Sequence, residues 1–188
     1  MTEEPEVIVR VEGFAARITL NRPRALNALN ADMCLAISEA LLAWRDDDRI
    51  GSVLIDGAGE RAFCAGGDIR VVAESGKGDG AEARRFFHAE YRMNELLTRY
   101  GKPVVAFMDG VTMGVGVGLS LPARYRIATE RTTWAMPEGD IGLFPDVGGG
   151  WHLARLPGEV GAWLALTGAR LRSADCLDFG VATHLVRS

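Results

Sequence analysis

The chain has 188 residues, of which 48% are hydrophobic and 24% are charged, and its formal net charge at pH 7 is −4. This length is enough for one domain with a real core, or for one domain and part of another. The negative charge argues against a nucleic-acid partner, and no apolar run approaches the length that crosses a membrane. The three cysteines are odd in number and widely spaced, which predicts reduced thiols in the cytoplasm rather than disulfides or a zinc site.

Short apolar runs alternate with longer amphipathic stretches along the chain. The expected strands are residues 7–10, 16–20, 52–56, 62–64, 104–108, 125–129, 133–136 and 181–186. The expected helices are 31–45, 81–100, a segment reaching about 121, 154–166 with a break near 157–158, and 173–179. No internal repeat is visible. The alternation predicts an α/β architecture, in which ligands collect where strands end and helices begin.

The stretch that organises the chain is residues 109–121, DGVTMGVGVGLSL, with glycines at 110, 114, 116 and 118. Glycine at this density weakens regular structure, so a reason for it is expected. The expected reason is that the backbone here comes close to a ligand or to another segment of the chain. A strand that turns into a helix through glycines aims free backbone N–H groups at one point, where they can hold negative charge. On this stretch alone, a tightly packed buried helix without a ligand is the slightly better explanation. No G-x-G-x-x-G pattern supports a dinucleotide site.

A second glycine turn, at residues 65–68, follows the short apolar run at 62–64. The two turns, near Gly67 and Val115, could each supply one backbone N–H to an oxyanion hole. Two acids have an unusual sequence context. Glu138 and Asp146 each follow a proline, and Asp146 precedes the glycine run at 148–150. That pattern suits a carboxylate presented on a shaped loop. Spacing alone leaves helix capping by both acids at least as open.

Three ordered blocks then resemble a known family: residues 18–23 and 26–29 (ITLNRP and LNAL), 62–69 (AFCAGGDI) and 109–114 (DGVTMG). They are similar to the successive signatures of the crotonase (enoyl-CoA hydratase/isomerase) superfamily. The resemblance implies an α/β fold of repeated ββα units wound in a spiral, the ClpP/crotonase fold, and an acyl-CoA thioester as ligand. It also places the oxyanion hole at the backbone N–H groups of Gly67 and Val115.

Four further blocks point to one branch of this superfamily. They are residues 86–91 (FFHAEY), 112–120 (TMGVGVGLS), 135–138 (AMPE) and 141–150 (IGLFPDVGGG). They resemble the branch that hydrolyses 3-hydroxyisobutyryl-CoA in valine catabolism. The resemblance implies Glu138 as nucleophile or general base, Asp146 as its orienting partner and Glu90 as the group that binds the 3-hydroxyl. Hydratases of the superfamily carry a second glutamate at the position that holds Gly118 here, which argues against ordinary hydration.

The resemblance also implies a path for coenzyme A along residues 22–28 and 64–69. The substrate-binding residues expected on it are Ala65, Gly66, Asp68, Gly114 and, as a phosphate partner, Arg24. Coenzyme A enters as part of the substrate, so no separate cofactor and no metal are expected. A homo-oligomer is the one protein partner that the resemblance suggests.

Two departures from the family pattern bear on function. Val115 stands where the branch usually has glycine, and its β-branched side chain could crowd the thioester or disfavour the required backbone angles. The family also continues into C-terminal helices, so residues 1–188 are expected to form one acyl-CoA-binding core without them. Two alternatives stay open: enoyl-CoA hydratase or isomerase activity, and a crotonase homologue that binds acyl-CoA without catalysis.

Overall fold

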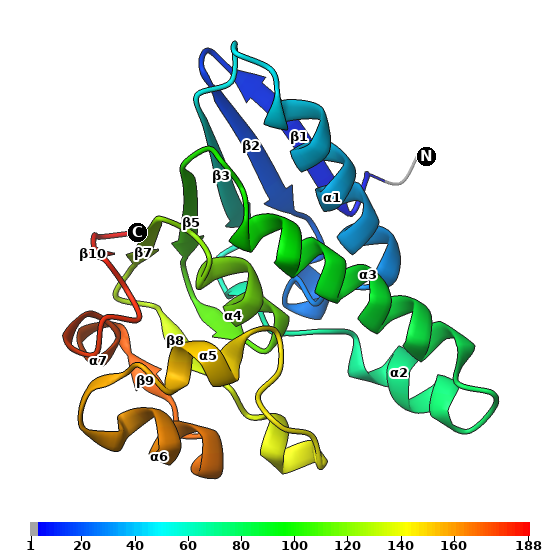
Figure 1. Cartoon of the computed structure of the whole chain (residues 1–188), viewed down its shortest axis with the longest axis vertical. Coiled ribbons are helices and arrows are strands. Elements are labelled where there is room, and N and C mark those ends of the chain that lie inside the picture. The colour runs from blue at the N-terminus through cyan, green and yellow to red at the C-terminus, as the bar shows by residue number, and fades with distance from the viewer. Residues whose placement is uncertain (1–3) are drawn as a thin grey trace.

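The computed structural model describes residues 4–188 and builds them around two β-sheets (Figure 1). The larger sheet has the strand order β1-β2-β3-β5-β7-β10. Strands β1 and β2 pair antiparallel, and each later neighbour pairs parallel. The bounds are Val7–Glu12 for β1, Ala15–Leu20 for β2, Ser52–Gly57 for β3, Val104–Met108 for β5, Tyr125–Ala128 for β7 and His184–Leu185 for β10.

The smaller sheet has the order β4-β6-β8-β9, with three parallel strands and an antiparallel β9 at its edge. Its strands are short: Ala62–Cys64 for β4, Val111–Met113 for β6, Thr133–Ala135 for β8 and Leu171–Arg172 for β9. Strands β6 and β9 were not expected from sequence. The apolar signal of β6 is hidden inside the glycine-rich stretch, and β9 is only two residues long.

The two sheets are built by the repeated ββα unit that the family resemblance implied, although no internal repeat is visible in the sequence itself. In each of the pairs β3–β4, β5–β6 and β7–β8, the first strand joins the larger sheet and the second joins the smaller one. A helical segment follows the second strand of each pair: α2 (Ile69–Gly76), α4 (Val115–Ser120) and the short 3-10 helix η2 (Glu138–Ile141). The parallel strands β4, β6 and β8 therefore end at one edge of their sheet, where three chain segments meet.

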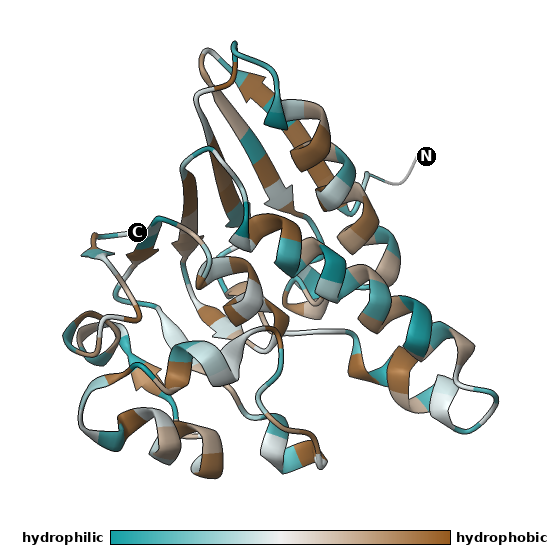
Figure 2. Ribbon diagram, in the orientation of Figure 1, coloured by the Kyte–Doolittle hydropathy of each residue, from teal (hydrophilic) through white to brown (hydrophobic). Residues whose placement is uncertain are grey.

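Two long helices, α1 (Ala31–Arg45) and α3 (Ala81–Thr98), lie side by side against the larger sheet (Figure 1). Asn30 begins α1, because its side chain accepts a 2.9 Å hydrogen bond from the Met33 N–H. Apolar residues of both helices and of the inner strands form one buried cluster, including Ile18, Ile37, Ile55 and Met93. The inner strands are correspondingly brown in Figure 2, whereas α3 mixes brown and teal. This packing gives α3 a fixed position beside the ends of β4 and β6.

The C-terminal part forms a second buried cluster around Trp134, Leu153, Leu164 and Cys176. Its elements are α5 (Gly149–Leu153), η3 (Pro157–Glu159), α6 (Val160–Thr167) and α7 (Ser173–Asp178). The sequence prediction was only partly right here. Residues 149–153 are helical although the three glycines favoured a loop, and the expected helix from 154 begins at Val160. The expected strand 181–186 is reduced to β10.

Between residues 4 and 188, no helix is long and apolar enough to cross a membrane.

Candidate active site

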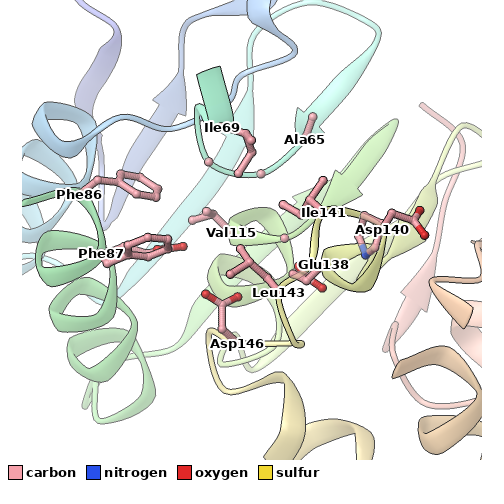
Figure 3. A pocket seen from close by; sticks show the side chains of 15 residues that line it. Ala65, Ile69, Phe86, Phe87, Val115, Glu138, Asp140, Ile141, Leu143 and Asp146 are labelled. Atoms are coloured by element: carbon pink, nitrogen blue, oxygen red, sulfur yellow. The ribbon is translucent and has the colours of Figure 1, made fainter. Parts of the chain in front are cut away.

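A cavity of about 280 Å³ lies where the segments after β4, β6 and β8 meet α3 (Figure 3). Each repeated unit contributes one segment to its wall, and α3 contributes a helix face. The lining residues are Ala65, Gly66, Gly67, Ile69, Phe86, Phe87, Glu90, Gly114, Val115, Pro137, Glu138, Asp140, Ile141, Leu143 and Asp146. The cavity thus joins most of the residues expected from sequence, although they are spread over about eighty positions of the chain.

Two free backbone N–H groups lie at this cavity. Val115 is the first residue of α4, and Gly67 lies in the turn after β4. Within residues 4–188, neither N–H donates a hydrogen bond to another backbone group. The two residues are close, because a Cβ added to Gly67 would lie 3.6 Å from Val115 Cγ2. Two free donors on adjoining turns can stabilise the oxygen of a carbonyl that becomes negatively charged.

An N-terminal segment, residues 22–29, holds the turn that carries Gly67. Leu26 O accepts a hydrogen bond from Ala65 N at 3.0 Å, Leu29 N donates to Gly66 O at 2.9 Å, and Leu29 O accepts from Asp68 N at 2.8 Å. These bonds use the polar groups on both sides of Gly67 and leave its own N–H free. The segment therefore fixes the direction of the Gly67 N–H.

Asn27 anchors this segment in the interior. It is fully buried, and its side-chain N–H₂ donates to Ala58 O at 3.0 Å and to Ala62 O at 2.8 Å. Its side-chain oxygen accepts from the Arg22 N–H at 3.0 Å. Its φ of +55° is one that asparagine tolerates better than most residues. The asparagine of the LNAL block thus has a structural role behind the turn that carries Gly67.

Glu138 and Glu90 are buried carboxyl groups that face the cavity from opposite sides. Glu138 is 6% exposed and Glu90 is 1% exposed, and each has a buried Oε2 with no hydrogen-bond partner in residues 4–188. Burial, followed by the nearby Asp146 charge, raises the pKa of Glu138 to about 7. Burial, followed by the charges of Asp146 and Glu138, raises the pKa of Glu90 to about 8. Near neutral pH, Glu90 is mostly protonated and Glu138 is partly ionised.

Asp146 is the third acid of the cavity and has a side-chain hydrogen-bond donor. The Tyr91 hydroxyl donates to Asp146 Oδ2 at 2.8 Å. Burial raises the pKa of Asp146, and the hydrogen bond from Tyr91 opposes that rise. The sequence left open that Glu138 and Asp146 cap helices, and that alternative is wrong: neither η2 nor α5 has a side-chain cap.

The rest of the wall is apolar. Phe86, Phe87, Ile69 and Leu143 surround the polar groups (Figure 3). Phe86 also explains why residue 67 is glycine, because a Cβ there would lie 2.6 Å from the Phe86 ring. An apolar wall with a few converging polar groups is typical of a small-molecule site, and it strengthens each electrostatic interaction inside.

The structure places two of the predicted site residues away from the cavity wall. Asp68 pairs with Arg22 at 3.0 Å, so its carboxylate ties the Gly67 turn to the N-terminal segment. Arg24 is exposed on the 3-10 helix η1 (Pro23–Ala25). The predicted strain at Val115 is absent, because its φ is not positive and it begins a regular helix. Its side chain lines the cavity, so crowding of the thioester stays a prediction.

Tyr91 is the residue at this site that sequence reasoning missed. A signal was present, because helical spacing puts residues 86, 87, 90 and 91 on one face of α3 and Glu90 was already a predicted site residue. The partner could not be found from sequence, since Asp146 lies 55 positions further along the chain. No group of His, Cys, Asp and Glu in residues 4–188 is arranged to hold a metal ion.

Comparison with known proteins identifies the class. A family model described as enoyl-CoA hydratase/isomerase matches residues 15–188, so the chain belongs to this family and has the crotonase fold. The matching crystal structures include a carnitinyl-CoA dehydratase from Mycobacterium thermoresistibile, with a TM-score of 0.95 and 48% identity over 98% of this chain and 54% of that one. An enoyl-CoA hydratase from Rhodobacter sphaeroides 2.4.1 has a TM-score of 0.92 and 47% identity over 97% of this chain and 55% of that one.

The curated relatives are more specific. The chain is 53% identical over 183 residues to the Danio rerio protein named 3-hydroxyisobutyryl-CoA hydrolase, mitochondrial, covering 97% of this chain and 48% of the relative. The Homo sapiens protein of the same name is 49% identical over 183 residues, covering 97% of this chain and 47% of the relative. The chain thus spans about half the length of the curated relatives that it matches.

Proposed function

We propose that this chain hydrolyses the CoA thioester of a short 3-hydroxyacyl group, with 3-hydroxyisobutyryl-CoA as the substrate. The observation that carries the proposal is the placement of Glu138 at the cavity that also holds the free N–H groups of Gly67 and Val115. The curated relatives named for this hydrolase support it. If the substrate is correct, the reaction belongs to valine catabolism.

In this proposal the thioester oxygen accepts hydrogen bonds from Gly67 N–H and Val115 N–H. Those bonds stabilise the negative charge that forms on oxygen when the carbonyl carbon is attacked, and one such donor is worth roughly 3 kcal/mol. Val115 N–H also lies at the N-terminal end of α4, but that helix has only six residues, so the direct hydrogen bond is the main effect. Both donors are fixed by backbone structure and need no rearrangement.

Glu138 supplies the reactive carboxylate by one of two routes. It can attack the carbonyl carbon, so that the C–S bond breaks, the CoA thiolate leaves and takes a proton, and water then cleaves the mixed anhydride. Alternatively it takes a proton from water, whose oxygen attacks the same carbon. Both routes need Glu138 ionised, and a pKa of about 7 supplies a reactive carboxylate near neutral pH.

Glu90 provides selectivity in this proposal. Its protonated carboxyl can both donate to and accept from the 3-hydroxyl of the acyl group. Without that hydroxyl, Glu90 would be left buried and unpaired, and a site built in this way rejects the analogue strongly. Ala65, Gly66 and Gly114 line the same cavity and are proposed to contact the acyl thioester. The roles of Asp68 and Arg24 in binding CoA stay predictions.

Hydration is the second candidate, because two of the matching crystal structures carry dehydratase and hydratase titles. One observation opposes it. Where the resemblance places a hydratase acid the chain has Gly118, and a Cβ there would lie 2.7 Å from Val147 Cβ and 3.1 Å from Asn94 Oδ1. Val147 has a φ of +44°, which is unusual for a β-branched residue, so the loop after Asp146 is forced into the space over Gly118.

The test compares three substrates on the wild-type chain. We expect thiol release from 3-hydroxyisobutyryl-CoA, at least about a hundredfold slower release from isobutyryl-CoA, which lacks the hydroxyl, and no loss of the enoyl absorbance of crotonyl-CoA. Hydration of crotonyl-CoA without thiol release would favour the hydratase. Binding of acyl-CoA without either reaction would favour a non-catalytic homologue.

Three wider expectations stay proposals. The described core, residues 4–188, is proposed to bind acyl-CoA as one unit, which calorimetry with a CoA thioether would test. Assembly into a homo-oligomer would be tested by light scattering. The expected cytoplasmic location also stays a prediction, and the curated relatives carry the word mitochondrial in their names.

A further inference from the structure

The hydrogen bond between Tyr91 and Asp146 joins two separate parts of the site. Tyr91 follows Glu90 on α3, and its ring packs against Phe87 with the ring centroids 5.8 Å apart. Asp146 lies on the loop between η2 and α5. Because the phenol ring is held by its aromatic neighbour, the 2.8 Å bond to Oδ2 also fixes the orientation of the carboxylate. Figure 3 shows that carboxylate directed into the space between Phe87 and Glu138.

Four acids line this cavity, and three of them, Glu90, Glu138 and Asp146, lie close enough for the charge of one to affect the ionisation of another. Within the described part of the chain, Glu90 and Glu138 each carry a buried oxygen without a hydrogen-bond partner, whereas Asp146 has a hydroxyl donor on one oxygen. The other ionisable groups beside Asp146 are Glu95 and Arg99 on α3, which line a second cavity behind its loop, and Asp140 on η2. Arg99 pairs with Glu95 at 3.4 Å and therefore offers Asp146 little net charge. The hydrogen bond from Tyr91 therefore favours the ionised form of Asp146 over that of the two glutamates.

We propose that Tyr91 is a positioning residue. Its hydrogen bond keeps Asp146 ionised and directs the second carboxylate oxygen of Asp146 toward the reacting water. This inference rests on the hydrolase proposed above and assigns a role that the motifs did not include. With Asp146 charged and fixed, Glu90 stays protonated and can meet the 3-hydroxyl. The free oxygen of Asp146 can hold a water molecule beside Glu138, because an ionised carboxylate accepts several hydrogen bonds.

Tyr91 suits this role because it remains a donor at every physiological pH. Burial and the hydrogen bond to Asp146 raise the pKa of the Tyr91 hydroxyl above its ordinary range. Tyr91 as a whole is 45% exposed, and its hydroxyl makes the polar contact with Asp146. Tyr91→Phe therefore removes one hydrogen bond and keeps the packing against Phe87.

The experiment is a carbon-13 NMR titration of the aspartate carboxyl groups, with the Asp146 signal assigned by its loss in Asp146→Asn. In Tyr91→Phe, we expect the titration midpoint of Asp146 to move to higher pH by about one unit, because a hydrogen bond to the charged form has been lost. Thiol release should fall about tenfold in kcat, with the affinity for a non-hydrolysable CoA thioether within twofold of wild type. The matched control is Tyr100→Phe, which removes a 2.8 Å hydrogen bond to Leu41 O away from the site. It should change neither the Asp146 titration midpoint nor kcat.

An Asp146 midpoint that is the same in wild type and Tyr91→Phe would overturn the inference, even if activity fell. A midpoint that moves equally in Tyr100→Phe would overturn it too, since the effect would then be general. If the wild-type chain releases no thiol, the proposal of hydrolase activity is wrong. The NMR titration midpoint of Asp146 still decides whether the Tyr91 hydrogen bond keeps Asp146 ionised. Thermal unfolding of each variant confirms that the compared proteins are folded.

Discussion

Gly114 and Glu138 lie in close contact at the cavity. A Cβ added to Gly114 would lie 3.4 Å from Glu138 Oε1 and 3.3 Å from Gly66 Cα. Gly114 also has φ +50° and ψ −118°, a backbone conformation that residues other than glycine rarely adopt. The glycine before α4 thus lets three segments meet: the turn that carries Gly67, the first turn of α4 and the carboxylate.

Gly114→Ala is expected to damage both stability and activity. The strained backbone alone costs about 1–3 kcal/mol of unfolding free energy, and displacement of Gly66 and the Glu138 carboxylate is expected to lower kcat, by less than the roughly hundredfold that a 1 Å shift can cause. Denaturant unfolding and thiol release measure the two effects. Gly139→Ala is the matched control, because a Cβ there meets nothing within 4 Å. Equal losses in both variants would argue against the close contact as the cause.

Val115 is expected to set the size of the acyl group. Its buried side chain lines the cavity beside the oxyanion donors, so an added or removed methyl group changes the room next to the carbonyl. Val115→Gly should raise kcat/KM for 3-hydroxyisobutyryl-CoA relative to unbranched 3-hydroxypropionyl-CoA by about tenfold, and Val115→Ile should lower the same ratio. The glycine variant should lose about 1–3 kcal/mol of stability. A ratio that is unchanged in both variants would show that Val115 does not limit the acyl group.

The anchoring role of Asn27 predicts that its loss lowers stability and also disturbs the turn that carries Gly67. Asn27→Ala leaves two buried carbonyl groups unpaired and puts alanine at φ +55°, so unfolding free energy should fall by about 2–4 kcal/mol. Thiol release should fall as well, because the turn that carries Gly67 loses its support. Asn21→Ala removes an exposed hydrogen bond to Pro5 O and should cost less than about 0.5 kcal/mol. A similar small cost for Asn27→Ala would contradict the anchoring role.

The buried acids predict that stability falls as pH rises. The pKa values of Glu90 and Glu138 are about 8 and 7 in the folded chain, above those of the unfolded chain. Between the unfolded and folded values the native state binds more protons, so this stabilisation is fully present below pH 4.5 and is lost as pH rises toward 8. Each group contributes a slope of at most about 1.4 kcal/mol per pH unit.

Denaturant unfolding at pH 5, 6, 7 and 8 checks this slope in wild type and in Glu90→Gln. The variant should have a shallower decline, because one of the two protons taken up on folding is gone. Glu39→Gln, on the exposed side of α1, is the control and should follow the wild type. A decline of the same slope in Glu90→Gln would mean that Glu90 is not the source.

The sequence was informative where the chemistry depends on residue type. The glycine turns at 65–68 and 109–121 and the acids after Pro137 and Pro145 identified seven residues that line one cavity, and the family resemblance added Glu90. The sequence was less informative where geometry depends on distant partners. Asp68 looks like a ligand-binding acid in its motif, yet Arg22 engages it, and the bond from Tyr91 to Asp146 spans 55 positions.

Backbone context explains the remaining differences in secondary structure. Residues 149–153 form a helix whose first residue, Gly149, packs closely against the Met136 side chain, so a glycine that normally weakens helices suits this buried position. The ββα repeat was expected from the family resemblance and is confirmed, although the units share no visible sequence pattern and the repeat appears only in the strand order of the two sheets.

The measurement that tests the central claim most directly is thiol release from 3-hydroxyisobutyryl-CoA by Glu138→Gln. Asp140→Asn is the control, because Asp140 lies on the same turn of η2 and points away from Glu138 in Figure 3. The account predicts that Glu138→Gln lowers kcat by about a hundredfold or more while binding of a CoA thioether is retained, and that Asp140→Asn stays near wild type. Thiol release that persists in Glu138→Gln at the wild-type rate would contradict the account.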